Sequence, residues 1–105
     1  MQSVQEILAQ LKRGLSSLYG SRLAAVLLYG SRARGDASAD SDIDVLVVLR
    51  GEYDPGEEIG RTSELVSGLS LQHDCLISCF YMSEDRYLTG GGPFLRNIRR
   101  EAVAV

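Results

Sequence analysis

Two aspartates, Asp42 and Asp44, stand on either side of a single isoleucine, just before the apolar run VLVVL. On a β-strand, side chains two residues apart point to the same face, roughly 6.5–7 Å apart along the chain. Two carboxylates placed in this way repel each other unless cations bind there. Carboxylate oxygens are the ligands that Mg²⁺ prefers. The spacing therefore predicts a Mg²⁺ site at the mouth of a strand whose odd-numbered residues, 43–49, fill the opposite face.

A Gly-Ser pair, Gly30 and Ser31, ends the preceding apolar run. Glycine lets the backbone approach a ligand closely, and a helix N-terminus and a serine hydroxyl both offer donors to an anion. Arg32 is either a charge-assisted phosphate ligand or a surface charge, and Arg34 is interpreted as a surface charge. The segment matches neither a Walker A loop nor G-x-G-x-x-G. It predicts a phosphate clamp that faces the two aspartates.

A third carboxylate, Asp74, lies near the start of the apolar run 73–82. If this run is a strand beside residues 42–49, Asp74 joins the same face, completes the metal site and helps to deprotonate an attacking hydroxyl. Three acids, Mg²⁺ and a phosphate clamp suit in-line displacement at phosphorus, where two metal ions ~3.5–4 Å apart stabilise the attacking and leaving oxygens. The alternative role of Asp74 is a cap at the start of the strand. Asp36 and Asp40 are interpreted as loop residues outside the site.

Helical and extended patterns alternate around these residues. Residues 3–19 predict an amphipathic helix, which a Ser-x-x-Glu capping box begins and a glycine ends. Strands are expected at 22–30, 42–49 and 73–82, and further helices at about 55–69, 84–89 and 93–102; residues 103–105 are a tail or an edge strand. Asp54 is expected to cap the helix that begins at residue 55, which should turn Ile59, Leu65, Val66 and Leu69 inward. The order α-β-α-β-α-β-α predicts a single α/β (α+β) domain over residues 1–105, with a small mixed sheet flanked by helices.

Composition excludes several classes of protein. A net charge of −3 over 105 residues argues against broad nucleic-acid binding, which needs a basic surface. No run approaches the ~20 apolar residues of a membrane span, and the N-terminus lacks the pattern of a secretory signal. Cys75 and Cys79 have no second Cys/His pair to complete a zinc site, so they are interpreted as buried reduced thiols. We therefore expect a cytoplasmic protein.

The pattern of Gly30-Ser31, ten intervening residues and Asp42-Ile43-Asp44 resembles the GS…DxD signature of the DNA polymerase β-like nucleotidyltransferase superfamily. Together with the short length, it resembles the minimal nucleotidyltransferase (MNT) domain proteins. The resemblance is specific from about residue 26 to residue 49, and it continues more loosely through Asp74 to the C-terminal residues. It implies a nucleotidyltransferase fold in which Gly30 and Ser31 hold the triphosphate of ATP. Asp42 and Asp44 would bind two Mg²⁺ ions, and Asp74 would complete the triad.

The same resemblance implies transfer of AMP from ATP to a hydroxyl acceptor, with release of pyrophosphate. Many MNT proteins are antitoxins that adenylylate a HEPN-type ribonuclease partner, and a chain of this size has little surface left for a small acceptor. Two alternatives stay open: transfer to a small molecule, as in aminoglycoside-modifying relatives, and a non-catalytic antitoxin that blocks its partner sterically. A homodimer is also left open. His73 and the arginines Arg96, Arg99 and Arg100 are interpreted as surface or packing residues, with the site rim and partner docking as the alternatives.

Overall fold

A four-stranded mixed sheet organises the computed structural model, which describes residues 3–37 and 41–105. β2 runs antiparallel to β1 and parallel to β3, while β4 is antiparallel to β1, so the spatial order is β3-β2-β1-β4. The strands are β1 (Leu23–Tyr29), β2 (Ile43–Leu49), β3 (Ile77–Ser83) and β4 (Val103–Ala104). The helical elements are α1 (Val4–Tyr19), the 3-10 turn η1 (Gly20–Arg22), α2 (Ser31–Arg34), α3 (Pro55–Gln72), α4 (Glu84–Thr89) and α5 (Pro93–Glu101). The predicted element order and mixed sheet are confirmed, and β4 shows that the C-terminal residues include an edge strand.

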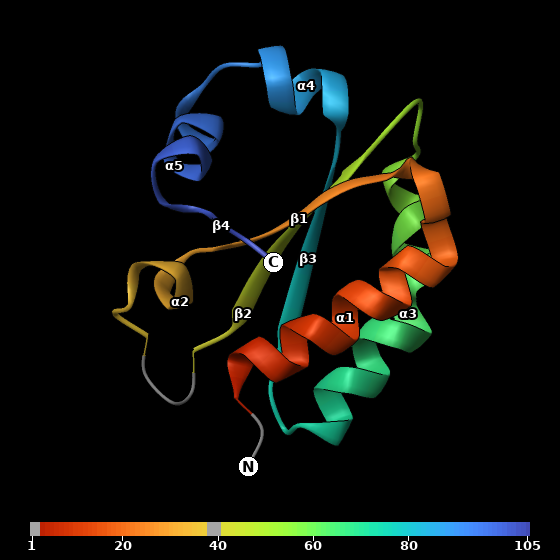
Figure 1. Cartoon of the computed structure of the whole chain (residues 1–105), viewed down its shortest axis with the longest axis vertical. Helices are drawn as coiled ribbons and strands as arrows, with labels where there is room; N and C mark the ends of the chain where they lie inside the picture. Colours follow the sequence, from red (N-terminus) through yellow and green to blue (C-terminus); the bar gives the residue numbers. More distant parts are fainter. Residues whose placement is uncertain (1–2, 38–40) are drawn as a thin grey trace.

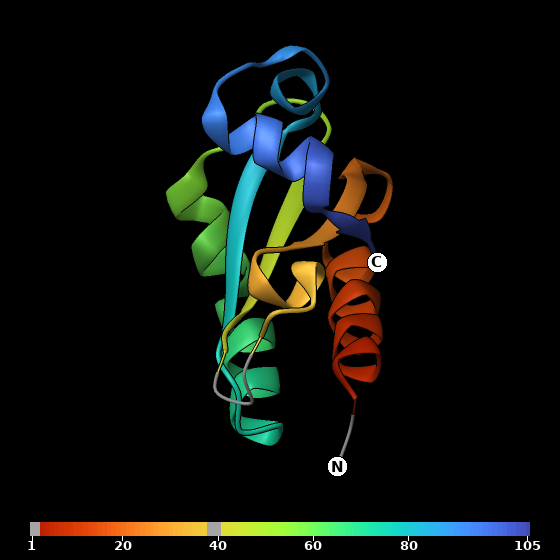
Figure 2. The ribbon, with the colours of Figure 1, turned by 90° about the vertical axis from the view of Figure 1, so that its left-hand side faces the viewer.

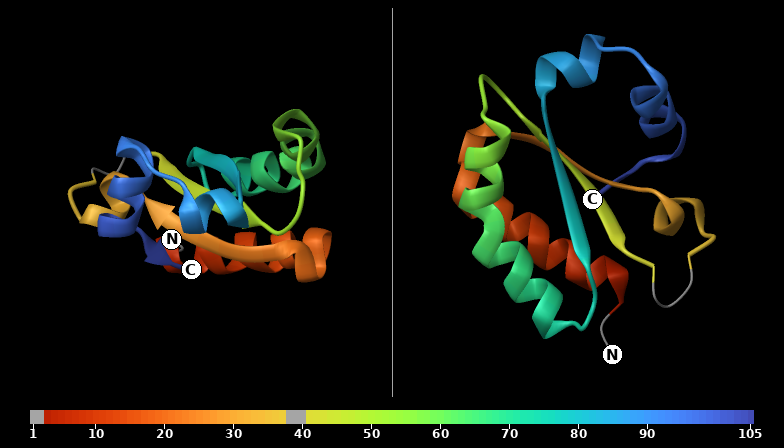
Figure 3. Two further views of the ribbon diagram at one scale, coloured as in Figure 1. Left: turned by 90° about the horizontal axis from the view of Figure 1, so that it is seen from above. Right: turned by 180° about the vertical axis from the view of Figure 1, so that it is seen from behind.

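Helices lie on both faces of this sheet. α1 and α3 pack side by side on one face (Figures 1 and 3), and α2 and α5 lie on the other (Figure 2). The odd-numbered residues of β2 join the core cluster under α1 and α3, whereas Leu46 and Val48 join the cluster under α5. Residue 44 therefore belongs to the face that α2 and α5 share. This alternation confirms that Asp44 and the odd-numbered apolar residues point to opposite faces.

The strand that carries Asp44 is the most deeply buried part of the chain. Every residue from 45 to 49 is fully buried between the two helical layers. A strand covered on both faces is continuously apolar, as the run VLVVL is. Because each buried Val or Leu side chain stabilises the fold by roughly 1.5–3 kcal/mol, this packing holds the start of β2 firmly in place. The acidic end of the strand is thus built on a rigid support.

Helix α3 turns Leu65, Val66 and Leu69 toward the core, as its sequence predicts, but not Ile59. Ile59 was expected to face inward, but its side chain is 58% exposed, and Glu58 is buried in its place. The prediction was wrong because it rested on hydrophobicity alone, whereas the buried Glu58 carboxylate has two hydrogen-bond donors. The Tyr19 hydroxyl donates to Glu58 Oε1 at 2.7 Å, and Arg61 Nε donates to the same oxygen at 3.0 Å. A buried acid with two such donors is tolerated. The prediction that Asp54 caps α3 is confirmed, since its side chain accepts from the backbone N–H of Glu57.

Two predicted boundaries also move. α3 continues to Gln72 rather than ending near residue 69, and β3 begins at Ile77 rather than at residue 73. Both shifts have one cause, a turn centred on Asp74 that is described below. Among the described residues, no helix is long and apolar enough to cross a membrane.

Candidate active site

Asp42 and Asp44 lie at the entrance of β2, next to the end of β1. Asp42 directly precedes the strand and is exposed, while Asp44 is its second residue and is half-buried. Burial raises the pKa of the Asp44 carboxyl, the negative charge of Asp42 raises it further, and the positive charge of Arg34 opposes both effects. The two carboxylates therefore act on each other, as the i, i+2 spacing predicts. Such unbalanced negative charge favours the binding of a cation.

Gly30 brings the predicted phosphate clamp into contact with these acids. Tyr29, the last residue of β1, is paired with Asp44 across the antiparallel ladder, so Gly30 follows directly beside that carboxylate. Gly30 has φ 76° and ψ −157°, a conformation that is nearly confined to glycine. A Cβ atom at this residue would stand only 2.5 Å from Asp44 Oδ2. Glycine is thus required here both for the turn and for the close approach of the backbone to the acid.

Ser31 begins α2, the single turn of helix that the sequence allowed as either a helix or a tight turn. The backbone amides of Ala33 and Arg34 both donate to the carbonyl oxygen of Gly30 at 3.1 Å. The amide of Gly35 donates to the carbonyl oxygen of Ser31 at 3.0 Å. These bonds fix the start of α2 directly beside Asp44. The hydroxyl of Ser31 and the first amides of α2 therefore lie at the same end of the turn as the two acids.

The two arginines of α2 make different contacts. Arg32 donates from Nε (3.1 Å) and Nη2 (2.9 Å) to the carbonyl oxygen of Ser41, which ties α2 to the residue just before Asp42. A phosphate contact from Arg32 stays a prediction. Arg34 is exposed, as predicted, and pairs with Asp36 at 3.2 Å and with Glu101 of α5 at 3.3 Å. The structure thus links α2 both to β2 and to α5.

Asp74 occupies a turn rather than a strand, which corrects the predicted strand 73–82. Its φ of 49° makes it the one non-glycine residue with positive φ among the described residues. The backbone amide of Cys75 donates to the carbonyl oxygen of Ser70 at 3.0 Å, and the backbone amide of Asp74 donates to the carbonyl oxygen of Leu71 at 3.4 Å. This is a Schellman cap with an aspartate in the position that glycine usually takes. The sequence prediction missed it because no glycine marks the end of α3.

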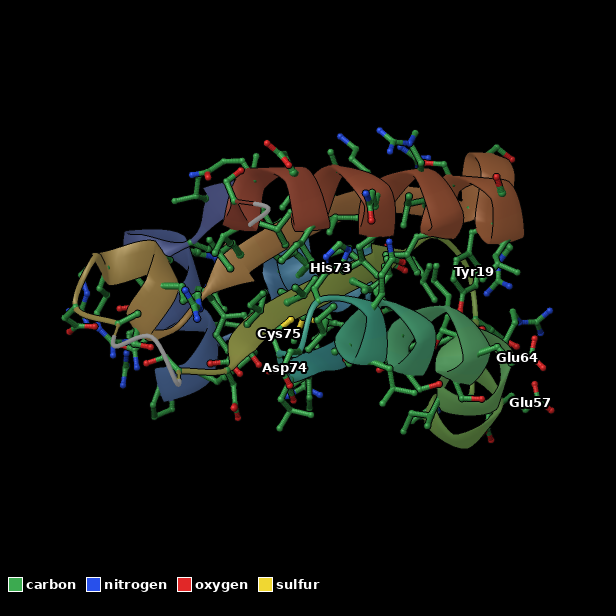
Figure 4. The ribbon with its side chains drawn as sticks, turned by 90° about the horizontal axis from the view of Figure 1, so that it is seen from below. Tyr19, Glu57, Glu64, His73, Asp74 and Cys75 are labelled. Atoms are coloured by element: carbon green, nitrogen blue, oxygen red, sulfur yellow. The ribbon has the colours of Figure 1, made fainter. Side chains whose placement is uncertain are left out.

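The position of Asp74 relative to the acid pair is nevertheless close. Asp74 and Asp42 line the same surface hollow, together with Ser41, Ser70, Leu71, Cys75 and Leu76. Figure 4 shows Asp74 and Cys75 at the turn that leaves α3, and the neighbouring His73 directed toward α1, where its Nε2 lies 3.0 Å from Gln10 Oε1. No group of three or more acidic, His or Cys side chains able to hold a metal occurs within residues 3–37 and 41–105. The third-carboxylate role of Asp74 therefore stays a prediction.

Strand register places residues in the site that the sequence did not single out. Across the parallel ladder, Asp44 is paired with Ser78 of β3, an exposed residue. Tyr29 flanks Asp44 on the other side, and burial, followed by the charge of Asp44, raises the pKa of its hydroxyl. Tyr29 and Phe80 were interpreted simply as core or interface residues. The alternation of side chains along β2 predicts which residues of that strand share a face with Asp44. The sequences of β2 and β3 do not show which residues of the two strands are paired across the ladder.

Two of the three arginines on α5, Arg99 and Arg100, have structural contacts. Arg99 donates through Nη2 to the carbonyl oxygens of Tyr87 and Gly90, each at 2.8 Å, and so ties α4 to α5. Arg100 donates to the side chain of Asn97 at 2.6 Å. Asp40 lies outside the described residues. The described site thus consists of Gly30, Ser31, Asp42 and Asp44, with Arg32, Arg34 and Ser78 around them.

The arrangement is similar to that of known proteins. The family model described as "Nucleotidyltransferase domain" matches residues 8–102. A relative from Methanocaldococcus jannaschii, "Putative protein adenylyltransferase MJ0141", is 37% identical over 73 residues, which cover 70% of this chain and 73% of the relative. Both matches extend well beyond the GS…DxD segment.

Two solved structures share the fold. The first, a "putative nucleotidyltransferase from Sulfolobus solfataricus", has a TM-score of 0.69 at 23% identity and covers 94% of this chain and 76% of that one. The second, a toxin–antitoxin with AMP-PNP, has a TM-score of 0.65 at 17% identity and covers 97% of this chain and 72% of that one. At these identities the likeness establishes the fold, and it confirms the predicted nucleotidyltransferase architecture.

Proposed function

This chain belongs to the nucleotidyltransferase domain family, and we propose that it transfers AMP from ATP to a hydroxyl group of a partner protein. The observation that carries the proposal is the contact of Gly30 with Asp44, where a Cβ atom would stand 2.5 Å from Oδ2. Because the clamp touches the acid, a phosphate chain held by one lies within reach of cations held by the other. The name of the M. jannaschii relative supports AMP as the transferred group and a protein as the acceptor.

Asp42 and Asp44 are the residues that would hold Mg²⁺. They fit this role because they are hard oxygen ligands, and burial, followed by the charge of Asp42, raises the pKa of Asp44, so a cation is needed to stabilise the ionised pair. When bound, Mg²⁺ supplies charge neutralisation along the phosphates. Gly30 and Ser31 would hold the β- and γ-phosphates through the first amides of α2 and the serine hydroxyl. Arg32 keeps the residue before Asp42 in place through its two bonds to Ser41.

In the proposed reaction, the oxygen of the acceptor hydroxyl attacks the α-phosphorus of ATP. A new oxygen–phosphorus bond forms while the bond from the α-phosphorus to the bridging oxygen of the departing pyrophosphate breaks. The hydroxyl proton passes to a carboxylate, and Asp74 is the candidate because it lines the same hollow as Asp42. Since the clamp holds the leaving group on the α2 side, in-line geometry brings the acceptor in from the side opposite the leaving group.

We further infer that the acceptor belongs to a HEPN-type toxin and that this chain is its antitoxin in the cytoplasm. The fold likeness to a toxin–antitoxin with AMP-PNP supports a partner protein and a nucleotide. The acid pair lies at the end of the internal strand β2, where Asp42 is exposed, and this leaves room for a second protein to complete the acceptor side. The expected complex therefore pairs one chain that binds ATP with one that presents a hydroxyl.

The test is a transfer assay with ATP labelled at the α-phosphate, Mg²⁺ and the HEPN-type protein encoded beside this chain. Label should move to that protein, and Asp42→Asn and Asp44→Asn should each abolish transfer, because an amide lacks the charge that Mg²⁺ needs. Asp85→Asn is the matched control, since Asp85 is an exposed acid on α4. It should leave transfer unchanged.

Two results would contradict the proposal in different ways. Label on small hydroxyl compounds alone would show a small-molecule nucleotidyltransferase. Equal neutralisation of the partner by the wild type and both Asn variants, without any label on protein, would show an antitoxin that acts by binding only.

A further inference from the structure

Three aromatic rings gather on the face of the sheet that carries Asp44. The ring of Phe94, at the start of α5, meets the ring of Tyr29 edge-on, with centroids 5.6 Å apart and an interplanar angle of 85°. It also meets the ring of Phe80 on β3, with centroids 5.3 Å apart and an interplanar angle of 51°. The three rings form one continuous row that joins β1, α5 and β3, which we call the aromatic row.

The aromatic row begins at the acid pair. Tyr29 is directly paired with Asp44, and on the other side Asp44 is paired with Ser78. Phe80 is two residues beyond Ser78 on the same face, a step of roughly 6.5 Å along the strand. The Phe80 end of the row therefore lies roughly 6.5 Å along the strand from the level of Asp44, about the length of a ribose, in the direction away from the mouth of β2.

Two of these rings keep much of their surface in solvent. Phe80 is 46% exposed and Phe94 is 37% exposed, although Leu46, which pairs with Phe80, is fully buried beneath them. Packing of the core alone does not require their outer faces. Exposed rings beside a reaction centre offer flat surfaces on which a planar ligand can stack.

The position of Phe94 is fixed at both ends of its helix. Leu95 and Ile98 are buried in the core beneath α5, and Glu101 near the helix end pairs with Arg34 of α2 at 3.3 Å. Figure 2 shows α5 crossing the sheet above α2 on the same face. The helix thus joins the clamp at one end to the aromatic row at the other, so the row is held in place before any ligand binds.

We propose that Phe80 and Phe94 bind the nucleobase of the donor nucleotide by stacking, a proposal that rests on the proposed function. The clamp places the β- and γ-phosphates over α2, and the aspartates place the α-phosphate at the mouth of β2. The ribose then spans the step to the aromatic row, where the base meets the two phenylalanine rings. Because a purine covers more of these rings than a pyrimidine does, the site prefers purines; phenylalanine has no hydrogen-bonding group to separate adenine from guanine.

Calorimetric titration with Mg²⁺ and three probes tests this assignment: a non-hydrolysable ATP analogue, the matching CTP analogue and inorganic tripolyphosphate. The variant is Phe80→Leu/Phe94→Leu, which keeps the apolar bulk over the core but removes both aromatic faces. Since base stacking is worth roughly 1–3 kcal/mol, the variant should bind the ATP analogue about ten-fold more weakly or worse. The CTP analogue should lose less, and tripolyphosphate should bind as it does to the wild type. Leu88→Ala, at a 65% exposed apolar side chain on α4, is the control and should change nothing.

Unchanged affinity for the ATP analogue in the double Leu variant would overturn the proposal and assign the rings to the acceptor or the partner. Equal loss for all three probes would also overturn it, because the rings would then act on the phosphate site and not on the base. Failure of the proposed function gives a different result: the wild type would bind neither tripolyphosphate nor the ATP analogue. Thermal unfolding of each variant confirms that the protein tested is folded.

Discussion

Replacing Gly30 by alanine separates the geometry of the site from the stability of the fold. The new Cβ atom would lie 2.5 Å from Asp44 Oδ2, whereas ordinary van der Waals contact begins at about 3.4 Å. Asp44 Cγ and Cβ would be at ordinary contact distances of 3.4 and 3.5 Å, so the clash falls on the carboxylate oxygen itself. The carboxylate must be displaced by about half an ångström to one ångström from the position that would bind Mg²⁺.

Two free energies follow from this displacement. An alanine held at φ 76° and ψ −157° strains the backbone by about 1–3 kcal/mol, which lowers the free energy of unfolding. The effect on the reaction is larger, because misplacing a catalytic group by about 1 Å costs on the order of 100-fold in rate. Gly30→Ala should therefore stay folded at 25 °C, with a reduced Tm, and lose about two orders of magnitude of kcat for AMP transfer.

Gly20→Ala is the matched control. Gly20, at the end of α1, also has positive φ (55°) and strongly negative ψ (−127°), but no atom lies within 4 Å of its added Cβ. Both variants should lose a similar amount in Tm, measured by calorimetry, while Gly20→Ala keeps its kcat. If Gly30→Ala transfers AMP as fast as Gly20→Ala, the contact with Asp44 does not position the site and the reasoning is wrong.

Four further outcomes are expected. Arg32→Lys should lower AMP transfer nearly as much as Arg32→Ala, because an ammonium cannot make the two bonds to the Ser41 carbonyl. Asp74→Gly should raise Tm, since glycine accepts φ 49° without strain, yet lower kcat; a fully active variant would leave Asp74 only its capping role. Asp44→Asn should raise Tm at pH 7 without Mg²⁺, because the raised pKa of Asp44 means that the ionised form is disfavoured in the folded state. That gain should vanish as the pH falls below the ordinary aspartate range, where Asp44 is protonated in both states, and a pH-independent gain would contradict it. Burial raises the pKa of the Cys79 thiol to about 11, so at pH 8 iodoacetamide should alkylate it about 100-fold more slowly than an ordinary thiol, as mass spectrometry of the labelled peptides can measure.

The parts of the site that could be predicted from the sequence are those whose structure the local residue pattern determines. Asp44 could be placed on the face opposite the odd-numbered residues because strand alternation is a property of the strand itself, and the burial of those residues confirms it. The end of β1 at Gly30 and the helical turn after it follow from residue type in the same way. The sequence also indicated the mixed sheet and most helices, because their apolar periodicity is strong.

The errors in the sequence predictions lie where the local residue pattern does not determine the structure. Asp74 was assigned to a strand because no glycine marks the end of α3, and an aspartate in the left-handed conformation leaves no local signal. Ile59 was placed inward because the buried hydrogen bond between Tyr19 and Glu58 joins residues 39 apart in sequence. The pairing of Asp44 with Ser78 depends on the register between β2 and β3, which the packing of α3 sets. The turn at Asp74 is local but has no glycine to mark it, and the other two interactions join segments that are distant in sequence.

The positions of the candidate site residues depend on the overall fold to different extents. The clamp and the acid pair come from two neighbouring segments, which the antiparallel pairing of Tyr29 with Asp44 brings together. The proposed clamp and acid pair thus lie within the fifteen consecutive residues 30–44 and on one pair of strands. The aromatic row and Asp74 come from β3, α3 and α5, whose positions depend on the whole fold. Substitutions in those elements can therefore change which nucleotide or acceptor is bound while the contact between Gly30 and Asp44 stays intact.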